Sequence, residues 1–238
     1  MSGIVRIEYF YDVISPYSAF CWRALRGYRQ HWGNYELVLR PMFLGGVMQA
    51  TGNKPPAMVA SRGAFQADDL RRNASLFGVP LLQPPSNFFS EVARSIIGCQ
   101  RLLIAAQMHE ATTDAHVEAL TESLTRNVHL NPDLRDEENA LKIDEAFIAA
   151  CLSEAGFSKE TSVKLGEMTS SAGVKEKLKR NTEEAVERGA FGSPTMFITP
   201  KDGGNEFMVF GSDRFEQIAF ACGLPYLGAN PSSQQSRL

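Results

Sequence analysis

The chain has 238 residues, 44% of them hydrophobic, and a formal net charge of -3. This length and composition allow one large domain or two small ones with a substantial core. The nearly balanced charge excludes the basic surface typical of proteins that bind nucleic acid or anionic membranes, so small-molecule or protein partners are expected. No apolar run approaches the ~20 residues needed to span a bilayer, so no membrane is expected either.

The N-terminal segment predicts a strand, a helix and a second strand. Residues 5–11 (VRIEYFY) alternate in polarity and are rich in β-branched and aromatic residues, which is typical of a strand. Ser15 and Pro16 then suit the start of a helix whose apolar stripe comprises Tyr17, Phe20, Cys21, Leu25 and Tyr28. Residues 35–42 predict a second strand, with a continuous apolar run at 37–39 that indicates burial. This order favours a parallel strand pair joined by a crossover helix.

A long helical block follows, and strand patterns return only near the C-terminus. Helical periodicity occupies residues 93–108, 116–130, 139–156 and 170–189. Residues 195–199 and 206–210 then predict a hairpin, and a last helix is predicted over 214–222. The order βαβ, helices, ββα indicates an α/β, thioredoxin-like fold interrupted by a large all-helical insertion. The predicted domains are residues 1–55 and 181–238 (thioredoxin-like, the second with a C-terminal tail) and 56–180 (helical insertion).

In a thioredoxin fold, the loop from the first strand into the first helix holds the active site. The free N–H groups and positive dipole end of the helix favour a thiolate there, and redox members place Cys-x-x-Cys at this point. Here the positions are Ser15-Pro16-Tyr17-Ser18. Serine cannot form a disulfide, but its hydroxyl can donate a hydrogen bond to the sulfur of a bound thiol. An ordinary helix N-cap remains the alternative.

Two further motifs carry candidate site residues. Ser193-Pro194 stands just before a strand, where thioredoxin folds carry a cis-proline, and the backbone of Ser193 is then expected to pair with a cysteinyl peptide. A proline that simply begins a strand is the alternative. Ser212 and Asp213 are predicted at the start of the last helix, where they suit the amino-acid end of a ligand. Helix capping alone would also explain them.

The cysteines and histidines do not form a recognisable site. The four cysteines are far apart without a CxxC pair, so the spacing supports neither a disulfide framework nor zinc, and buried thiols are expected. The four histidines show no HExxH spacing. No metal is therefore expected.

Four motifs together resemble kappa-class glutathione S-transferase. They are FYDVISPYS (10–18), GNKPP (52–56), GAFGSP (189–194) and FGSDR (210–214), in the order and at the spacing typical of that class, over nearly the whole chain. The resemblance implies a thioredoxin fold with an inserted helical domain, a homodimer, glutathione as thiol co-substrate, and a mitochondrial or peroxisomal location. It also implies conjugation to small electrophiles, with reduction of hydroperoxides as a further activity.

The resemblance further implies roles for individual residues. Ser15 matches the serine that hydrogen-bonds the glutathione sulfur, and Pro16 and Tyr17 belong to the same loop. Asn53 matches a glutathione contact after the second strand, and Arg62 matches a basic residue near the glycyl carboxylate. Ser193 and Pro194 match the backbone-pairing position and its cis-proline. Ser212 and Asp213 match the pair that holds the γ-glutamyl end.

Two alternatives to the transferase remain open. One is a glutathione-dependent isomerase of the 2-hydroxychromene-2-carboxylate type, which has a similar serine turn. The other is a non-catalytic thiol- or peptide-binding module of the thioredoxin fold. The chain ends in Ser236-Arg237-Leu238, which resembles the peroxisomal address Ser-Lys-Leu, on a polar tail that is expected to be accessible from Ala229 onward. A peroxisome and its import receptor are therefore expected, with a mitochondrial or cytosolic location as the alternative.

Overall fold

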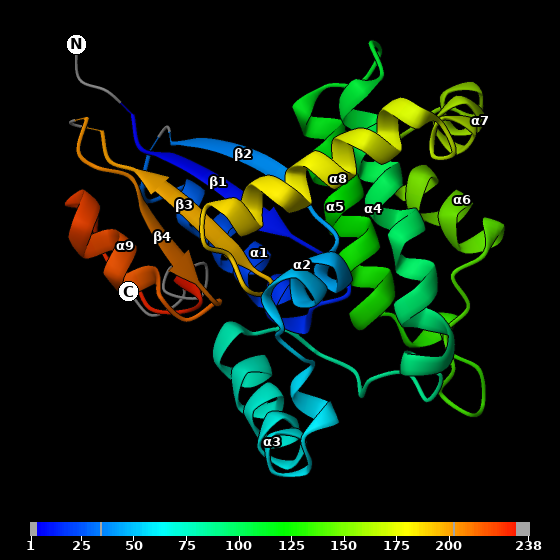
Figure 1. Cartoon of the computed structure of the whole chain (residues 1–238), viewed down its shortest axis with the longest axis horizontal. Helices are drawn as coiled ribbons and strands as arrows, with labels where there is room; N and C mark the ends of the chain where they lie inside the picture. The colour runs from blue at the N-terminus through cyan, green and yellow to red at the C-terminus, as the bar shows by residue number, and fades with distance from the viewer. Residues whose placement is uncertain (1–3, 34, 202, 232–238) are drawn as a thin grey trace.

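The computed structural model describes residues 4–33, 35–201 and 203–231. Its sheet has the order β2-β1-β3-β4, with β1 (Arg6–Tyr11), β2 (Glu36–Pro41), β3 (Thr195–Thr199) and β4 (Phe207–Phe210). Strand β1 is parallel to β2 and antiparallel to β3, which pairs antiparallel with β4. This mixed sheet, shown in Figure 1, confirms the predicted βαβ and ββα halves of a thioredoxin-like fold.

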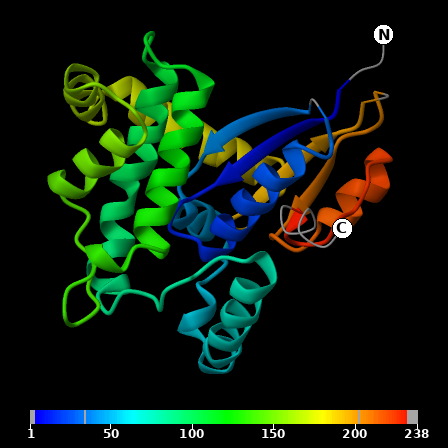
Figure 2. The same cartoon turned by 180° about the vertical axis from the view of Figure 1, so that it is seen from behind.

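Helices cover both faces of the sheet. The helix α1 (Pro16–Arg29) lies on one face and α8 (Ala172–Glu187) crosses the other, as the two opposite views show (Figures 1 and 2). The side chains of β1 alternate between the two faces of the sheet. Ile7, Tyr9 and Tyr11 join the main core, whereas Phe10 belongs to a smaller cluster with Phe197 of β3. Helix α9 (Phe215–Cys222) packs against α1 by stacking the rings of Tyr28 and Phe215.

The predicted helical insertion forms a separate layer beside the sheet (Figure 1). It contains α4 (Ala93–Met108), α5 (Asp114–His129), α6 (Glu145–Glu154) and α7 (Lys159–Met168), and α3 (Ala60–Phe77) projects on its own below the sheet. The short helical turns are η1 (Pro56–Met58), η2 (Phe88–Val92) and η3 (Pro132–Leu134). Gln100 of α4 ties this layer to the sheet by donating to the backbone carbonyls of Tyr11 and Met42, both at 2.8 Å.

Three details of the sequence prediction were wrong. Leu37 and Val38 are only half-buried because β2 is an edge strand and not an inner one. The helix predicted over 139–156 begins at Glu145, because Arg135 and Leu141 form an isolated bridge and Asp144 is the N-cap. The last helix begins at Phe215, with Arg214 at the N-cap, so Ser212 and Asp213 lie in the turn before it.

The sequence prediction also gave no helices for α3 and α7 inside the block it expected to be helical, and it missed one helix outside that block, α2 (Leu44–Thr51). Its two glycines, Gly45 and Gly46, are poor helix formers, so no local pattern indicated it. Tertiary packing selects it, because Val47 is fully buried and a Cβ at Gly46 would come within 3.1 Å of Thr182 on α8. Helix α8 itself runs unbroken past residue 180, and the domain boundaries stay a prediction.

The C-terminal tail was expected to be accessible from Ala229 onward. The structure contradicts this expectation for the part of the tail that ends at Pro231. Tyr28 donates to the carbonyl of Gly228 at 2.7 Å and accepts from the amide of Leu227 at 3.0 Å. Pro231 is buried and Ala229 packs against the core. The Ser236-Arg237-Leu238 motif lies outside the described residues. Within the described ranges, none of the helices is both long and apolar enough to cross a bilayer.

Candidate active site

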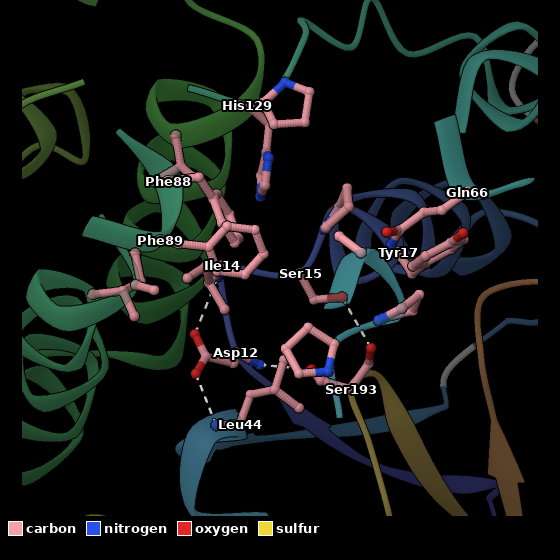
Figure 3. Close-up of a pocket in the computed structure, with 18 of the residues that line it drawn as sticks. Asp12, Ile14, Ser15, Tyr17, Leu44, Gln66, Phe88, Phe89, His129 and Ser193 are labelled. Atoms are coloured by element: carbon pink, nitrogen blue, oxygen red, sulfur yellow. Dashed lines mark hydrogen bonds between the residues drawn. The ribbon is translucent and has the colours of Figure 1, made fainter. Parts of the chain in front are cut away.

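A pocket of about 550 Å³ opens where the first strand runs into α1. Six of the predicted site residues line it, namely Ser15, Pro16, Tyr17, Asn53, Arg62 and Ser193. They come from the β1–α1 loop, the first turn of α1, the loop after α2, helix α3 and the loop before β3. Figure 3 shows the centre of this pocket with Ser15 and Ser193 facing each other. The fold therefore brings together residues that are up to 178 positions apart in the chain.

The hydroxyl of Ser15 points across the pocket floor. Ser15 occupies the N-cap position of α1 but makes no side-chain capping bond. Its Oγ instead donates to the backbone carbonyl of Ser193 at 2.9 Å. Ser15 is 5% exposed, so this hydroxyl is held between the helix N-terminus and the Ser193 backbone. An ordinary capping role for its side chain is excluded by this geometry.

Ser193 is joined to the same loop by its side chain as well. The Ser193–Pro194 peptide bond is cis, as the fold predicted. The Ser193 Oγ accepts from the backbone amide of Asp12 at 2.9 Å and lies 2.9 Å from the Oγ of Ser18. Buried polar groups are costly unless they are paired, so these contacts explain why a hydroxyl is tolerated here.

Asp12, which the sequence analysis did not single out, is a fully buried carboxyl in the wall of this pocket. Its two oxygens accept from the backbone amides of Ile14 at 3.1 Å and Leu44 at 2.9 Å, as Figure 3 shows. Burial raises the pKa of Asp12 to about 7, although these two hydrogen bonds act in the opposite direction. An acidic residue directly after a strand, at the loop that carries the serines, is the sequence pattern that could have indicated it.

Tyr17 connects the loop to helix α3. Its hydroxyl donates to Asp69 at 2.9 Å, and its ring stands beside Gln66 in Figure 3. Burial, with Asp69 and more weakly Asp213 adding negative charge, raises the pKa of Tyr17 well above its usual range. The phenol is therefore neutral at physiological pH and acts as a hydrogen-bond donor. Arg62 lies one helical turn before Gln66 and is exposed at the pocket rim.

Asn53 ties the loop after α2 to the cis-proline loop. Its side-chain amide donates to the carbonyl of Phe191 at 2.7 Å, and its Oδ1 accepts from the amide of Lys54 at 2.8 Å. Gly192 in the same loop allows the Phe210 ring to pack closely, because a Cβ there would come within 2.8 Å of that ring. Asn53 thus already has partners on both polar ends of its side chain.

The remaining predicted residues lie next to the pocket and not in its wall. The carbonyl of Pro194 accepts from the amide of Gly211 at 3.0 Å, which holds the following turn beside the cis-proline. In that turn Ser212 is buried and Asp213 is exposed. Asp213 pairs with Arg214 at 2.6 Å and does not cap α9, so the capping alternative is wrong for Asp213.

The far side of the pocket is mostly apolar. Ile14, Phe88, Phe89 and Ile96 line it, together with Leu81 and Leu82. His129 lies there with its Nε2 at 2.8 Å from the carbonyl of Val13. Burial, assisted by the charge of nearby Arg135, lowers the pKa of His129 to about 4, so the ring is neutral at physiological pH.

Cys21, Cys99, Cys151 and Cys222 are all buried free thiols, as the sequence predicted. In the described part of the chain, no three His, Cys, Asp or Glu side chains gather as a possible metal site.

Comparison with known proteins agrees with this geometry. Residues 6–222 match the family described as DsbA-like thioredoxin domain. Glutathione S-transferase kappa 1 of Rattus norvegicus is 33% identical over 98% of this chain and 97% of its own, and the Homo sapiens protein is 32% identical over the same shares. A solved 2-hydroxychromene-2-carboxylate isomerase superposes with a TM-score of 0.69 at 24% identity, covering 92% of this chain and 94% of its own. The last similarity shows the fold alone.

Proposed function

We propose how the pocket works in this chain, which belongs to the DsbA-like thioredoxin domain family and to the kappa class of glutathione S-transferases. It is an enzyme that conjugates glutathione to small electrophiles, with Ser15 as the residue that stabilises the thiolate. The contact that carries this assignment is the 2.9 Å hydrogen bond from Ser15 to the Ser193 carbonyl, at the N-terminus of α1.

This contact suggests how the thiol is seated. A cysteinyl peptide that pairs with the Ser193 backbone brings its own N–H to the carbonyl that Ser15 now occupies. The Ser15 hydroxyl then turns its proton toward the cysteinyl sulfur, which lies over the N-terminus of α1. A hydroxyl donor and a helix N-terminus both favour the thiolate over the thiol.

The size of this pKa effect limits the rate enhancement that Ser15 alone can supply. A free thiol has a pKa of about 8.5, and lowering it by about two units stabilises the thiolate by about 2.7 kcal/mol. The thiolate fraction near neutral pH then rises by only about tenfold, and each thiolate becomes a weaker nucleophile. Orientation of the electrophile against the sulfur must supply the rest, and the apolar side of the pocket suits that task.

We assign the ends of glutathione to the two sides of the serine loop. Asp213 and Ser212 are proposed to hold the γ-glutamyl end, because their turn is fixed beside Pro194. Arg62 at the pocket rim is proposed for the glycyl carboxylate, and Asn53 and Tyr17 for the peptide between them. Asn53 and Asp213 have partners of their own in this structure, so each of these contacts requires an exchange of hydrogen bonds.

The cellular role of the enzyme is proposed from its resemblance to the kappa class and from its C-terminal Ser236-Arg237-Leu238 motif. We propose that the enzyme acts as a homodimer in detoxification of electrophiles, and that it also reduces hydroperoxides. We further propose a peroxisomal location, through an import receptor that reads Ser236-Arg237-Leu238. A mitochondrial or cytosolic location is the alternative.

Two substrate tests separate the candidate functions. The purified protein should conjugate glutathione to 1-chloro-2,4-dinitrobenzene, with loss of chloride, faster than the uncatalysed reaction. Turnover of a 2-hydroxychromene-2-carboxylate without that conjugation would favour the isomerase. Glutathione binding without either reaction would identify a non-catalytic module.

A further inference from the structure

One cation in the apolar side of the pocket has no described counter-ion. Arg135 follows η3 and lines the pocket on the side of His129, whose pKa it influences. One guanidinium nitrogen, Nη2, donates to the carbonyl of Val128 at the end of α5. The other two, Nε and Nη1, are buried and have no hydrogen-bond partner within the described residues. A guanidinium carries five N–H donors, so the Val128 contact leaves most of its capacity unused.

The charge of Arg135 is not neutralised by the pocket's own carboxyl. Among the lining residues, Asp12 is the acidic one, and both of its oxygens already accept backbone amides. No carboxylate within the described residues forms an ion pair with Arg135. Burial lowers the pKa of Arg135, but guanidinium stays charged at any physiological pH. A buried charge without a partner is costly, so an anion is strongly favoured beside it.

This cation is separate from the one assigned to glutathione. Arg62 belongs to α3, on the side of Gln66 and Tyr17, whereas Arg135 lies with His129 and the aromatic residues Phe88 and Phe89 (Figure 3 labels these landmarks). The surroundings of the two cations also differ, since Arg62 is exposed and Arg135 is partly buried. An anion held by Arg135 would therefore belong to the second substrate and not to the thiol.

We propose that Arg135 binds the carboxylate of the electrophile, so that the second substrate is an apolar, carboxylate-bearing molecule. The apolar body of such a molecule fits the Phe88 and Ile96 side of the pocket. The Nε and Nη1 donors are buried in this structure, so the guanidinium must turn toward the pocket to meet the carboxylate. A planar guanidinium presents parallel N–H groups only in pairs that include Nη2, so a two-pronged contact would also take Nη2 from the Val128 carbonyl. Such a contact fixes the direction of the ligand as well as its charge. This inference rests on the proposed function, because it places the reacting sulfur at Ser15.

A matched pair of substrates tests the preference without any variant. In both 4-chloro-3,5-dinitrobenzoate and its methyl ester, the thiolate forms a C–S bond at the carbon that loses chloride with its bonding electrons. Each kcat/KM is divided by the uncatalysed rate constant with glutathione at the same pH, because the ester is intrinsically more reactive. We expect the corrected value for the acid to exceed that for the ester by at least about tenfold, the scale of a charged hydrogen bond.

Variants then assign the preference to Arg135. In Arg135→Met, the acid-to-ester ratio should fall to near one, and Arg135→Lys should retain part of it. Arg71→Met, on the exposed face of α3, should keep the wild-type ratio. A wild-type protein without the acid preference, or an Arg135→Met variant that keeps it, would overturn the proposal.

A binding measurement separates this proposal from the proposed function. Calorimetric titration with 4-phenylbutyrate and with neutral 4-phenylbutanamide needs no glutathione and no turnover. Tighter binding of the acid that is lost in Arg135→Met supports the carboxylate subsite even if neither the benzoates nor 1-chloro-2,4-dinitrobenzene are conjugated, in which case the transferase assignment fails. Conjugation of both benzoates with equal corrected rates, and equal binding of acid and amide, overturns the subsite and leaves the transferase assignment intact.

Discussion

The hydroxyl oxygens of Ser18 and Ser193 lie 2.9 Å apart, in contact across 175 residues of sequence. Redox members of the fold place the second cysteine of Cys-x-x-Cys at the position of Ser18. Here a hydroxyl fills that position and bonds to the residue before the cis-proline. The contact joins the start of α1 to the loop before β3, so it stabilises the pocket floor around Ser15.

A double-mutant cycle should detect this contact. Ser18→Ala and Ser193→Ala should each lower the free energy of unfolding by about 1 kcal/mol, and Ser193→Ala by more because the amide of Asp12 also loses its acceptor. The coupling energy should be about 1 kcal/mol, measured by urea denaturation. Ser18→Ala combined with Ser158→Ala, the N-cap of α7, should be additive. A coupling energy of zero between 18 and 193 would show that the contact does not contribute.

Replacement of Ser15 should change the ionisation of bound glutathione. In Ser15→Ala the pKa of the bound thiol should rise by about one to two units toward the value of a free thiol, because one hydrogen-bond donor is lost. Turnover should fall, with a smaller effect on glutathione affinity. Ultraviolet absorbance of the bound thiolate against pH measures this, and Ser90→Ala on the exposed side of η2 is the control. An unchanged titration curve in Ser15→Ala would contradict the assignment.

Replacement of Asp213 should weaken glutathione binding and leave the ionisation of the bound thiol unchanged. Asp213→Ala should weaken glutathione binding by about 1.5–3 kcal/mol, the scale of a hydrogen bond to a charged group. The pKa of the bound thiol should hardly move, because the γ-glutamyl end is remote from the sulfur. Calorimetric titration provides the test. Glu216→Ala, an acidic residue in the first turn of α9, should bind normally, and equal affinity in Asp213→Ala would refute the role.

The buried carboxyl of Asp12 should make stability depend on pH. Burial raises its pKa to about 7, whereas an unfolded aspartate titrates near about 3.9, so the folded state holds the proton more tightly. Its contribution to the free energy of unfolding is therefore greatest below about pH 4 and is lost as pH rises to 7, by up to about 4 kcal/mol. His129 acts in the opposite direction, because its folded pKa is lowered.

Comparison of wild type with Asp12→Asn isolates this effect from that of His129. The difference in the free energy of unfolding between the two proteins, measured by urea denaturation from pH 4 to pH 8, should change with pH up to 7 and then level off. Asp12→Asn loses one of the two amide acceptors, so it should be the less stable protein at pH 4. A difference that is constant across this range would mean that Asp12 does not titrate there.

The chain end should direct the protein to peroxisomes. The protein carrying a fluorescent tag at its N-terminus should appear in punctate organelles, and deletion of Leu238 should move it to the cytosol. Arg237→Lys is the matched control and should keep the punctate pattern, since it restores the usual Ser-Lys-Leu address. If the tagged protein with its intact C-terminus is diffuse or mitochondrial from the start, the proposed location is wrong.

Local patterns in the sequence were enough to predict the order of the four strands, the helices α1 and α9, and the position of the serine loop. Strand alternation, helical periodicity and the Ser15-Pro16 start of α1 each depend on residues close in the chain, so they can be read directly. The strand β3 was predicted at its observed bounds for this reason. Helix α2 was missed because its glycines contradict local propensity, and only packing against α8 selects it.

The functional contacts, by contrast, were decided by tertiary structure. Ser15 and Ser18 were visible as a pair, but only the folded chain turns the Ser15 hydroxyl toward Ser193 and away from a capping role. The burial of Asp12 depends on α2, whose first residue, Leu44, lies 32 positions away in the sequence. Contacts of this kind arise from packing between the sheet and the inserted helices, and no spacing along the chain encodes them.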